Sequence, residues 1–260
     1  MVGYISYTEE NRGLEITRKR IGGLILLEVR LGQEGRLLER MHARRAAKLL
    51  ARRGIRETVF PMDYPHMDLF AKRGILPVDV LPLYRAMAPL VIKQKMIRLG
   101  IAAGSASAVI LAERATAEVG WLLRELAMHI RYVILDADGG EDFCMQLQRE
   151  FGVSVIRQPR REQIEQADVL VLLGPPEEGL KLTQPVVFRI YDGEQVLQRN
   201  GVDFRLPRRL LEQVEENCDQ KQLLGVLLRA GMLQNYQIPI MEVDIPEKSY
   251  YNASTVINIE

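Results

Sequence analysis

The stretch AVILAERATAEVG, residues 108–120, decides the fold class of this chain. It has the outline of a buried strand that turns tightly into a helix. The turn predicted between them reads Ala112, Glu113, Arg114, Ala115 and contains no glycine. The residues on either side of this stretch indicate the kind of sheet to which the strand belongs.

The alternation of strand and helix continues after this stretch. The segments predicted in this way, beginning with a strand, are 108–112, 116–130, 131–138, 140–152, 153–159, 161–167 and 168–176. The strands are short, apolar and β-branched, which is typical of a parallel sheet covered by helices on both faces. We therefore expect residues 109–111, 133–135 and 169–171 on adjacent parallel strands of one sheet.

Strands and helices also alternate in the residues before 108. Strand patterns such as YISYT and LEITR precede a helix predicted over 33–53, and a second long helix is predicted over 83–100. The small residues of GIAAGSASA, residues 100–108, are typical of a linker. The sequence thus predicts an N-terminal α/β lobe over 1–100 and a second lobe over 101–260.

Two elements are predicted near the C-terminal end of the second lobe. PVVFRIYDGEQVLQ, residues 185–198, is predicted as two strands joined at Asp192–Gly193, because Asp-Gly favours a tight hairpin turn. Residues 207–231 are predicted as C-terminal helices that Gly231 terminates.

Residues 108–173 resemble the first half of a Rossmann-type domain of the NAD(P)-binding-like α/β superfamily. The resemblance lies in the order and spacing of the elements, and it extends to LDAD at the end of the second strand. Asp136 follows Ala112 by 24 residues, and at this spacing the family has an acidic residue that binds ribose hydroxyls. The resemblance implies an α/β fold with Arg114, Asp136 and Asp138 as candidate cofactor-binding residues.

The turn departs from the family's G-x-G-x-x-G pattern, which falls on Ala112, Arg114 and Ala117. The side chain of Arg114 obstructs the close approach of backbone and pyrophosphate that the second glycine allows. Glu113 would repel a phosphate at the helix N-terminus. An arginine can also bind a phosphate directly, so the sequence argues against NAD(P) without removing it as a cofactor.

Two further clusters have a functional and a structural interpretation. Asp63, His66 and Asp68 can form a metal or acid–base site, but a turn before a short helix is the preferred interpretation. Residues 36–53 carry seven basic side chains and one acidic side chain, as helices that bind nucleic acid do. They include no aromatic residue to stack on bases, so we expect a solvated helix face instead.

The overall composition limits the classes of function. The 35 basic and 34 acidic side chains give a net charge of +1, which provides no strong attraction to nucleic acid or membranes. The N-terminus lacks the pattern of a signal peptide, no apolar run is long enough to span a bilayer, and we expect a cytoplasmic protein. The motifs of the common nucleophilic and metal-dependent enzymes are absent, and no catalytic residue or metal ligand set is identified.

The sequence favours a binding or interaction protein on a degenerate Rossmann-like scaffold. Its ligand is unknown, and a small molecule, a protein partner or a second copy of the chain in a homo-oligomer all remain open. The alternative is a nucleotide- or NAD(P)-dependent enzyme that uses the cleft between the lobes, an analogy at the level of fold.

Overall fold

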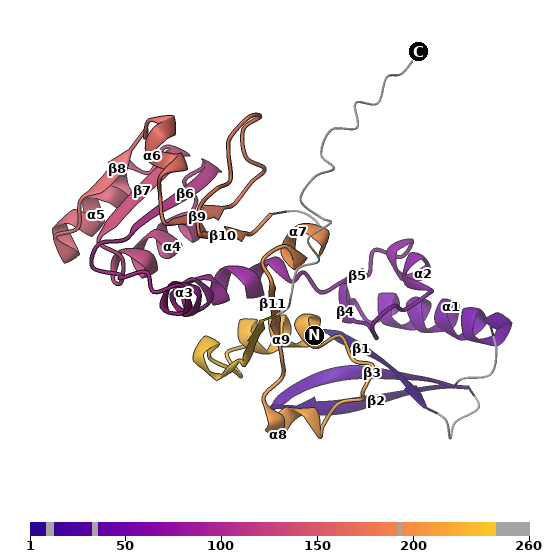
Figure 1. The fold of residues 1–260 in the computed structure, drawn as a ribbon. Coiled ribbons are helices and arrows are strands. Elements are labelled where there is room, and N and C mark those ends of the chain that lie inside the picture. Colours follow the sequence, from indigo (N-terminus) through magenta and orange to yellow (C-terminus); the bar gives the residue numbers. More distant parts are fainter. Residues whose placement is uncertain (9–12, 33–35, 192–193, 243–260) are drawn as a thin grey trace, which may run out of the picture. The chain divides into compact units, whose positions relative to one another are not determined.

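The computed structural model describes residues 1–8, 13–32, 36–191 and 194–242, and these fall into two compact units. The first unit comprises Met1–Ala86 and Phe204–Pro239, and the second comprises Met87–Asp203 together with strand β12 (Ile240–Glu242) (Figure 1). The units divide inside helix α3 (Leu81–Arg98), whereas the sequence places a boundary near residue 100. The helix continues past this division because its residues are good helix formers, and it ends just before Gly100, which has a φ of 68°.

The first unit is built on a sheet with the order β2-β3-β1-β4-β5. Its strands are β1 (Gly3–Thr8), β2 (Leu14–Ile21), β3 (Leu24–Gly32), β4 (Glu57–Val59) and β5 (Leu76–Pro77). β2 and β3 form an antiparallel hairpin whose turn is Gly22–Gly23, with φ values of 55° and 93° that suit glycine. β3, β1, β4 and β5 pair in parallel. α1 (Arg36–Arg52) connects β3 to β4, and α2 (Met67–Ala71) connects β4 to β5, whereas β1 and β3 are parallel because β2 between them in the chain runs in the opposite direction.

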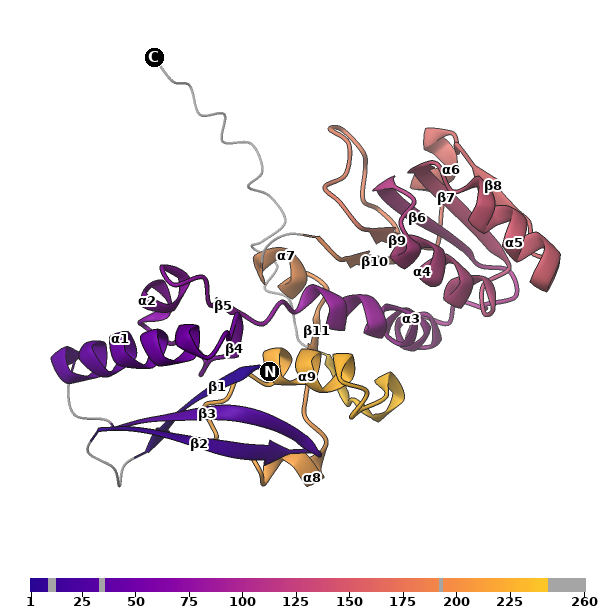
Figure 2. The ribbon, with the colours of Figure 1, turned by 180° about the vertical axis from the view of Figure 1, so that it is seen from behind.

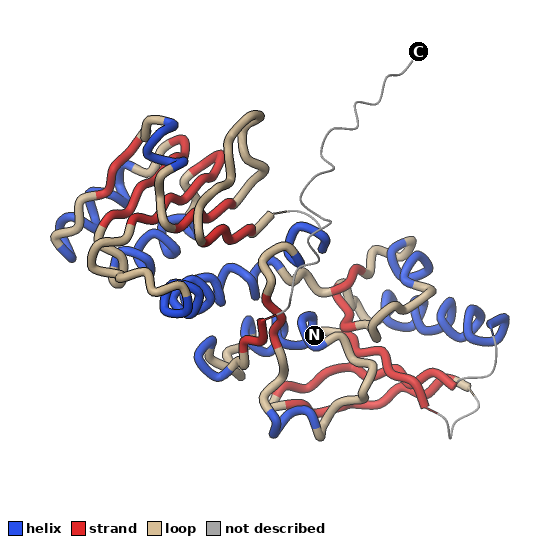
Figure 3. The backbone as a smooth tube through the Cα atoms, in the orientation of Figure 1, coloured by secondary structure: helices blue, strands red, loops and turns tan. Residues whose placement is uncertain are grey.

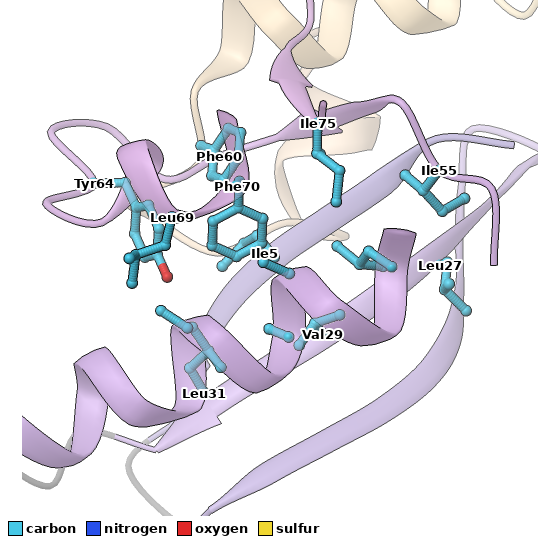
Figure 4. Packing of buried hydrophobic residues seen from close by; sticks show 14 residues of the cluster. Ile5, Leu27, Val29, Leu31, Ile55, Phe60, Tyr64, Leu69, Phe70 and Ile75 are labelled. Atoms are coloured by element: carbon cyan, nitrogen blue, oxygen red, sulfur yellow. The ribbon is translucent and has the colours of Figure 1, made fainter. Parts of the chain in front are cut away.

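The core of the first unit lies between this sheet and helices α1 and α2. Figure 4 shows aromatic rings of the loop and helix after β4 gathered near Ile5 of β1. The ring centroids of Phe60 and Phe70 lie 5.1 Å apart in an edge-on contact. Ala43, Ala46, Ala47 and Leu50 are fully buried on one face of α1.

The second unit contains a parallel sheet with the order β10-β9-β6-β7-β8. Its strands are β6 (Ser107–Arg114), β7 (Tyr132–Asp138), β8 (Val155–Arg157), β9 (Val169–Leu172) and β10 (Val186–Arg189). Val109 pairs with Ile134 on one side and with Leu170 on the other. The prediction that residues 109–111, 133–135 and 169–171 form adjacent parallel strands is therefore confirmed.

Helices cover both faces of this sheet. α4 (Ala117–Ala127) and α5 (Glu141–Phe151) lie on one face, and α6 (Arg161–Glu165) lies on the other (Figures 1 and 2). Ile164 of α6 packs with Val109 and Leu170 in a buried cluster. The α/β class predicted from the sequence is thus confirmed, and Figure 3 shows the strands of both units in red among their helices.

The second half of the hairpin predicted over 185–198 is wrong. Residues Glu194–Gln198 form helix α7, because Glu, Gln and Leu favour a helix over a strand. The predicted turn at Asp192–Gly193 lies outside the described residues.

The segment after α7 returns to the first unit. β11 (Val202–Phe204) pairs with β12, and helices α8 (Arg208–Leu211) and α9 (Gln220–Arg229) follow β11. Gly231 has a φ of 69° directly after the end of α9, as predicted for its terminating glycine. A short 3₁₀ helix, η1 (Asn235–Gln237), precedes β12.

Candidate functional site

The strand order of the second unit reverses at β6, which has β7 on one side and β9 on the other. In open parallel sheets, ligands bind at the carboxyl ends of the strands where such a reversal occurs. The candidate site of this protein is therefore the carboxyl edge formed by the ends of β6, β7 and β9. Arg114, Asp136 and Asp138 all lie on this edge.

The turn after β6 is shorter than the sequence predicts. β6 continues through Ala112, Glu113 and Arg114, with a register shift between Leu111 and Arg114, and its last pair is Arg114 with Asp138. Only Ala115 and Thr116 remain between the strand and α4. Cross-strand pairing with β7 thus includes Arg114, which the sequence places in the turn.

Backbone N–H groups of this turn are bonded within the chain. Ala115 donates to the carbonyl of Asp138 at 2.9 Å, and Thr116 donates to the carbonyl of Arg114 at 3.0 Å. The N–H of Val119 donates to the hydroxyl of Thr116, the N-cap of α4, at 3.4 Å. Dinucleotide-binding turns direct such donors at the pyrophosphate, whereas here they stabilise the turn itself.

The loop after β7 packs directly against this turn. Gly140 has a φ of 90°, and a Cβ atom at this position would lie 3.1 Å from the Cβ of Ala115 and 2.9 Å from Leu135. The glycine that permits this close approach is therefore in the loop after β7, whereas the G-x-G-x-x-G pattern has its glycines in the loop after β6. The space between the ends of β6 and β7 is occupied by protein.

Acidic side chains gather at the same edge. Burial raises the pKa of Asp136, and the negative charges of Glu177 and Asp138 raise it further. Alternation along β7 places Asp136 and Asp138 on the same face as Ile134, which is the face that α6 covers. A cation beside these three carboxyl groups would relieve their repulsion, and a phosphate beside them would increase it.

Glu177 is the residue of this site that the sequence alone did not identify. It lies in LGPPEEG, residues 173–179, the loop after β9. The signal that could have identified it is its position after a strand neighbouring β6. Arg114 and Glu113 are both exposed at the end of β6.

The other clusters considered from the sequence lie around the start of α2 and on α1. Asp68 forms an ion pair with Lys72 one helical turn away, at 3.4 Å, and Asp63 is exposed with a φ of 55°. Within the described part of the chain, no group of three or more His, Cys, Asp or Glu side chains is placed to hold a metal ion. The basic residues Arg44, Arg45 and Lys48 lie on the exposed side of α1, and the absence of nucleic-acid binding stays a prediction.

A buried ionic network in the first unit was not expected from the sequence. Lys19 on β2 lies 3.2 Å from the carboxylate of Glu28 on β3 and 2.6 Å from Glu215, which follows α8. Tyr4 donates a hydrogen bond to Glu215, and Ser6, Thr17 and Arg30 donate to Glu28. Burial acts to raise the pKa of Glu215, but its bonds from Lys19 and Tyr4 outweigh burial and hold it below the ordinary value. The network ties the segment after α8 to the sheet, and its groups are mutually paired.

Comparisons with known proteins give no family. No family model matches the chain, and no curated protein matches its sequence. L-tryptophan dehydrogenase from Nostoc punctiforme is similar in structure at 10% identity and a TM-score of 0.34, over 66% of this chain and 52% of that chain. The chain thus spans about half the length of that dehydrogenase.

Two other solved structures are similar at the same level. One of the subunits of dipicolinate synthase from Bacillus halodurans has 13% identity and a TM-score of 0.36 over 68% of this chain and 67% of that chain. Aspartate transcarbamoylase from Trypanosoma cruzi has 12% identity and a TM-score of 0.36 over 89% of this chain and 81% of that chain. Similarities this low carry no information about ligand or activity.

Among the described residues, no helix has the length and hydropathy needed to cross a bilayer.

The fold is assigned from the order and direction of the strands. Counted from β6, the strand order β8-β7-β6-β9-β10 is 3-2-1-4-5, and the strands are parallel with helices on both faces. This order makes the second unit a Rossmann-type α/β fold, and the turn after its first strand contains no glycine.

Proposed function

We propose that this protein is a binding or interaction protein, and that the candidate site receives a positively charged group instead of a dinucleotide. The observation that carries the proposal is the internal bonding of the turn after β6. The N–H groups of Ala115 and Thr116 already donate to carbonyls of Asp138 and Arg114. Each of these hydrogen bonds would have to break before its N–H could bind a phosphate, and the loss of about 1 kcal/mol per bond offsets much of the gain.

The charge of the site supports a cationic ligand. Asp136, Asp138 and Glu177 lie close enough for the latter two to raise the pKa of the first. An ammonium or guanidinium group beside them would form charge-assisted hydrogen bonds and neutralise their repulsion. The ligand would be either a small amine or a lysine or arginine side chain of a partner protein.

Isothermal titration calorimetry on the full chain tests this proposal, with spermidine and agmatine as cationic probes and NAD and NADP as dinucleotides. We expect the amines to bind and both dinucleotides to show no binding at micromolar concentrations. Asp136→Asn should weaken amine binding about tenfold, the effect of losing a hydrogen bond to a charged group. Glu162→Gln removes an exposed charge in α6 and should leave amine binding unchanged.

Two results would contradict the proposal in different ways. If NAD or NADP binds with a micromolar dissociation constant, Arg114 is a phosphate ligand and an NAD(P)-dependent enzyme becomes the better function. If spermidine binds Asp136→Asn and the unmodified protein equally, the acidic edge is not a cation site.

A further inference from the structure

A cavity of about 200 Å³ lies in the second unit between α3 and α4. These helices lie side by side in both ribbon views (Figures 1 and 2). Aliphatic side chains of Ile92, Met96, Ile101, Leu126 and Ile130 line the cavity. It is next to the C-terminal end of α4, whereas the candidate site adjoins the N-terminal end of the same helix.

The lining residues connect the cavity to the surface. Ile92, Met96, Leu126 and Ile130 are buried, but Ile97 in the same wall is 70% exposed, and Ala103 is exposed as well. A void enclosed in the core would have buried residues on all sides. This arrangement is that of an apolar pocket open to solvent, and such pockets are the usual form of small-molecule sites.

The polar side chains at the cavity are a lysine and a histidine. Lys93 and His129 contribute to the lining and are exposed, and none of the described residues that line the cavity is acidic. Lys93 is a cation at neutral pH with a flexible stem that can reach a group at the opening. An anionic group is therefore the complement of this opening, and a hydrocarbon is the complement of its walls.

We propose that this cavity binds a small carboxylate, with its hydrocarbon body between α3 and α4 and its carboxylate group at Lys93 and His129. The volume limits the size of the body. An apolar cavity of about 150 Å³ accommodates benzene, so a cavity of this size suits a body of about six to eight carbons. Hexanoate and octanoate are the corresponding straight-chain probes.

Titration calorimetry with butanoate, hexanoate, octanoate and decanoate on the full chain tests the apolar part of the proposal. Each added methylene should raise the affinity about fourfold, the factor that corresponds to burying one methylene group, until the cavity is full near eight carbons. Ala103→Leu places a larger side chain in the lining and should abolish octanoate binding. Ala102→Leu adds the same atoms at the preceding exposed residue, outside the lining, and should leave binding unchanged.

A second pair of variants tests the recognition of the carboxylate group. Lys93→Gln should weaken octanoate binding about three- to fivefold, as expected for an exposed ion pair, without changing the binding of octanol. Lys48→Gln removes an exposed charge from α1 and should have no effect on either compound.

Three outcomes would overturn the proposal. Equal octanoate affinity for Ala103→Leu and the unmodified chain would place the binding elsewhere. A Lys93→Gln variant that binds octanoate as tightly as the unmodified chain would remove the carboxylate recognition. A dimer in sedimentation velocity that Ala103→Leu dissociates, without octanoate binding, would identify a second copy of the chain as the occupant.

Discussion

At the residue scale, Asp136 combines burial on β7 with the nearby negative charges of Glu177 and Asp138, and all three effects raise its pKa. A carboxyl group whose pKa is higher in the folded state contributes stability that is fully present below its unfolded pKa, near 3.9. That contribution is lost as the pH rises through the raised pKa. Above that raised pKa, burial and the two neighbouring negative charges make the ionised carboxylate unfavourable in the folded state.

Asp136→Asn should accordingly raise the melting temperature at pH 7, by about 1–3 °C for a chain of this size. The amide keeps the shape of the side chain and removes its repulsion from Glu177 and Asp138. Differential scanning calorimetry at pH 7 and pH 3 checks this, and the gain should disappear at pH 3. A loss of stability at pH 7 would show that the carboxylate has a stabilising partner.

Glu113 and Arg114 provide a second prediction at this scale. Replacing both with glycine removes the charge and the bulk that the sequence places against a pyrophosphate. We nevertheless expect no gain of micromolar affinity for NAD or NADP, because the N–H groups of Ala115 and Thr116 stay bonded to the backbone. Calorimetric titration of the Glu113→Gly, Arg114→Gly double variant measures this, and micromolar binding would mean that the side chains alone block the site.

At the scale of elements, the loop between β7 and α5 fixes the turn after β6. Gly139 and Gly140 both have positive φ values, 78° and 90°, in which other residues are strained. A Cβ atom on Gly139 would meet nothing within 4 Å, whereas one on Gly140 would collide with Leu135 and crowd Ala115. Comparing substitutions at Gly139 and Gly140 therefore distinguishes the cost of backbone strain from the cost of a packing collision.

Gly140→Ala should destabilise the protein more than Gly139→Ala does. Both variants carry the strain of a positive φ, which is about 1 kcal/mol. Gly140→Ala adds the collision, and overpacking of this kind costs about 1–3 kcal/mol more. Urea unfolding measures the free energy of unfolding of each variant. Equal losses of this free energy would mean that the loops after β6 and β7 can move apart without an energetic cost.

The strands of the second unit show which structural features a local sequence pattern predicts and which it does not. The adjacency of β6, β7 and β9 follows from short apolar runs joined by helices, because such crossovers leave few arrangements. The end of β6 does not follow from the pattern, since the strand continues to Arg114, a polar residue that pairs with Asp138 of β7. Likewise, Glu194–Gln198 is helical although Asp192–Gly193 indicated a hairpin.

At the scale of the whole molecule, the first unit is completed by residues distant in sequence. The N–H of Phe60 donates to the side chain of Gln222 on α9 at 3.1 Å, and Met62 donates to the carbonyl of Asn217 at 2.8 Å. Leu223, Leu224 and Leu227 of α9 are fully buried. Phe204–Pro239 is thus a structural part of the first unit.

A chain that ends at Asp203 should therefore lose the amide protection of β1, β3 and β4 in hydrogen exchange. β6, β7 and β9 should keep most of theirs, because their core comes from residues before Asp203. A chain that ends at Pro239 is the matched control, since both truncations remove β12 and only the first removes α8 and α9. Unchanged protection of β1–β4 in the shorter chain would contradict this division.

The sequence by itself determined the α/β class, the adjacency of β6, β7 and β9, and the absence of glycine from the turn after β6. These are properties of residues close together in the chain, where side-chain periodicity and backbone sterics act directly. Only the tertiary structure placed Glu177 within electrostatic reach of Asp136, Gly140 against Ala115, and Lys19 between Glu28 and Glu215. Each of these placements depends on how far a strand pairs or how closely a loop packs. A local pattern does not determine such distances, because they are set by the packing of the whole unit.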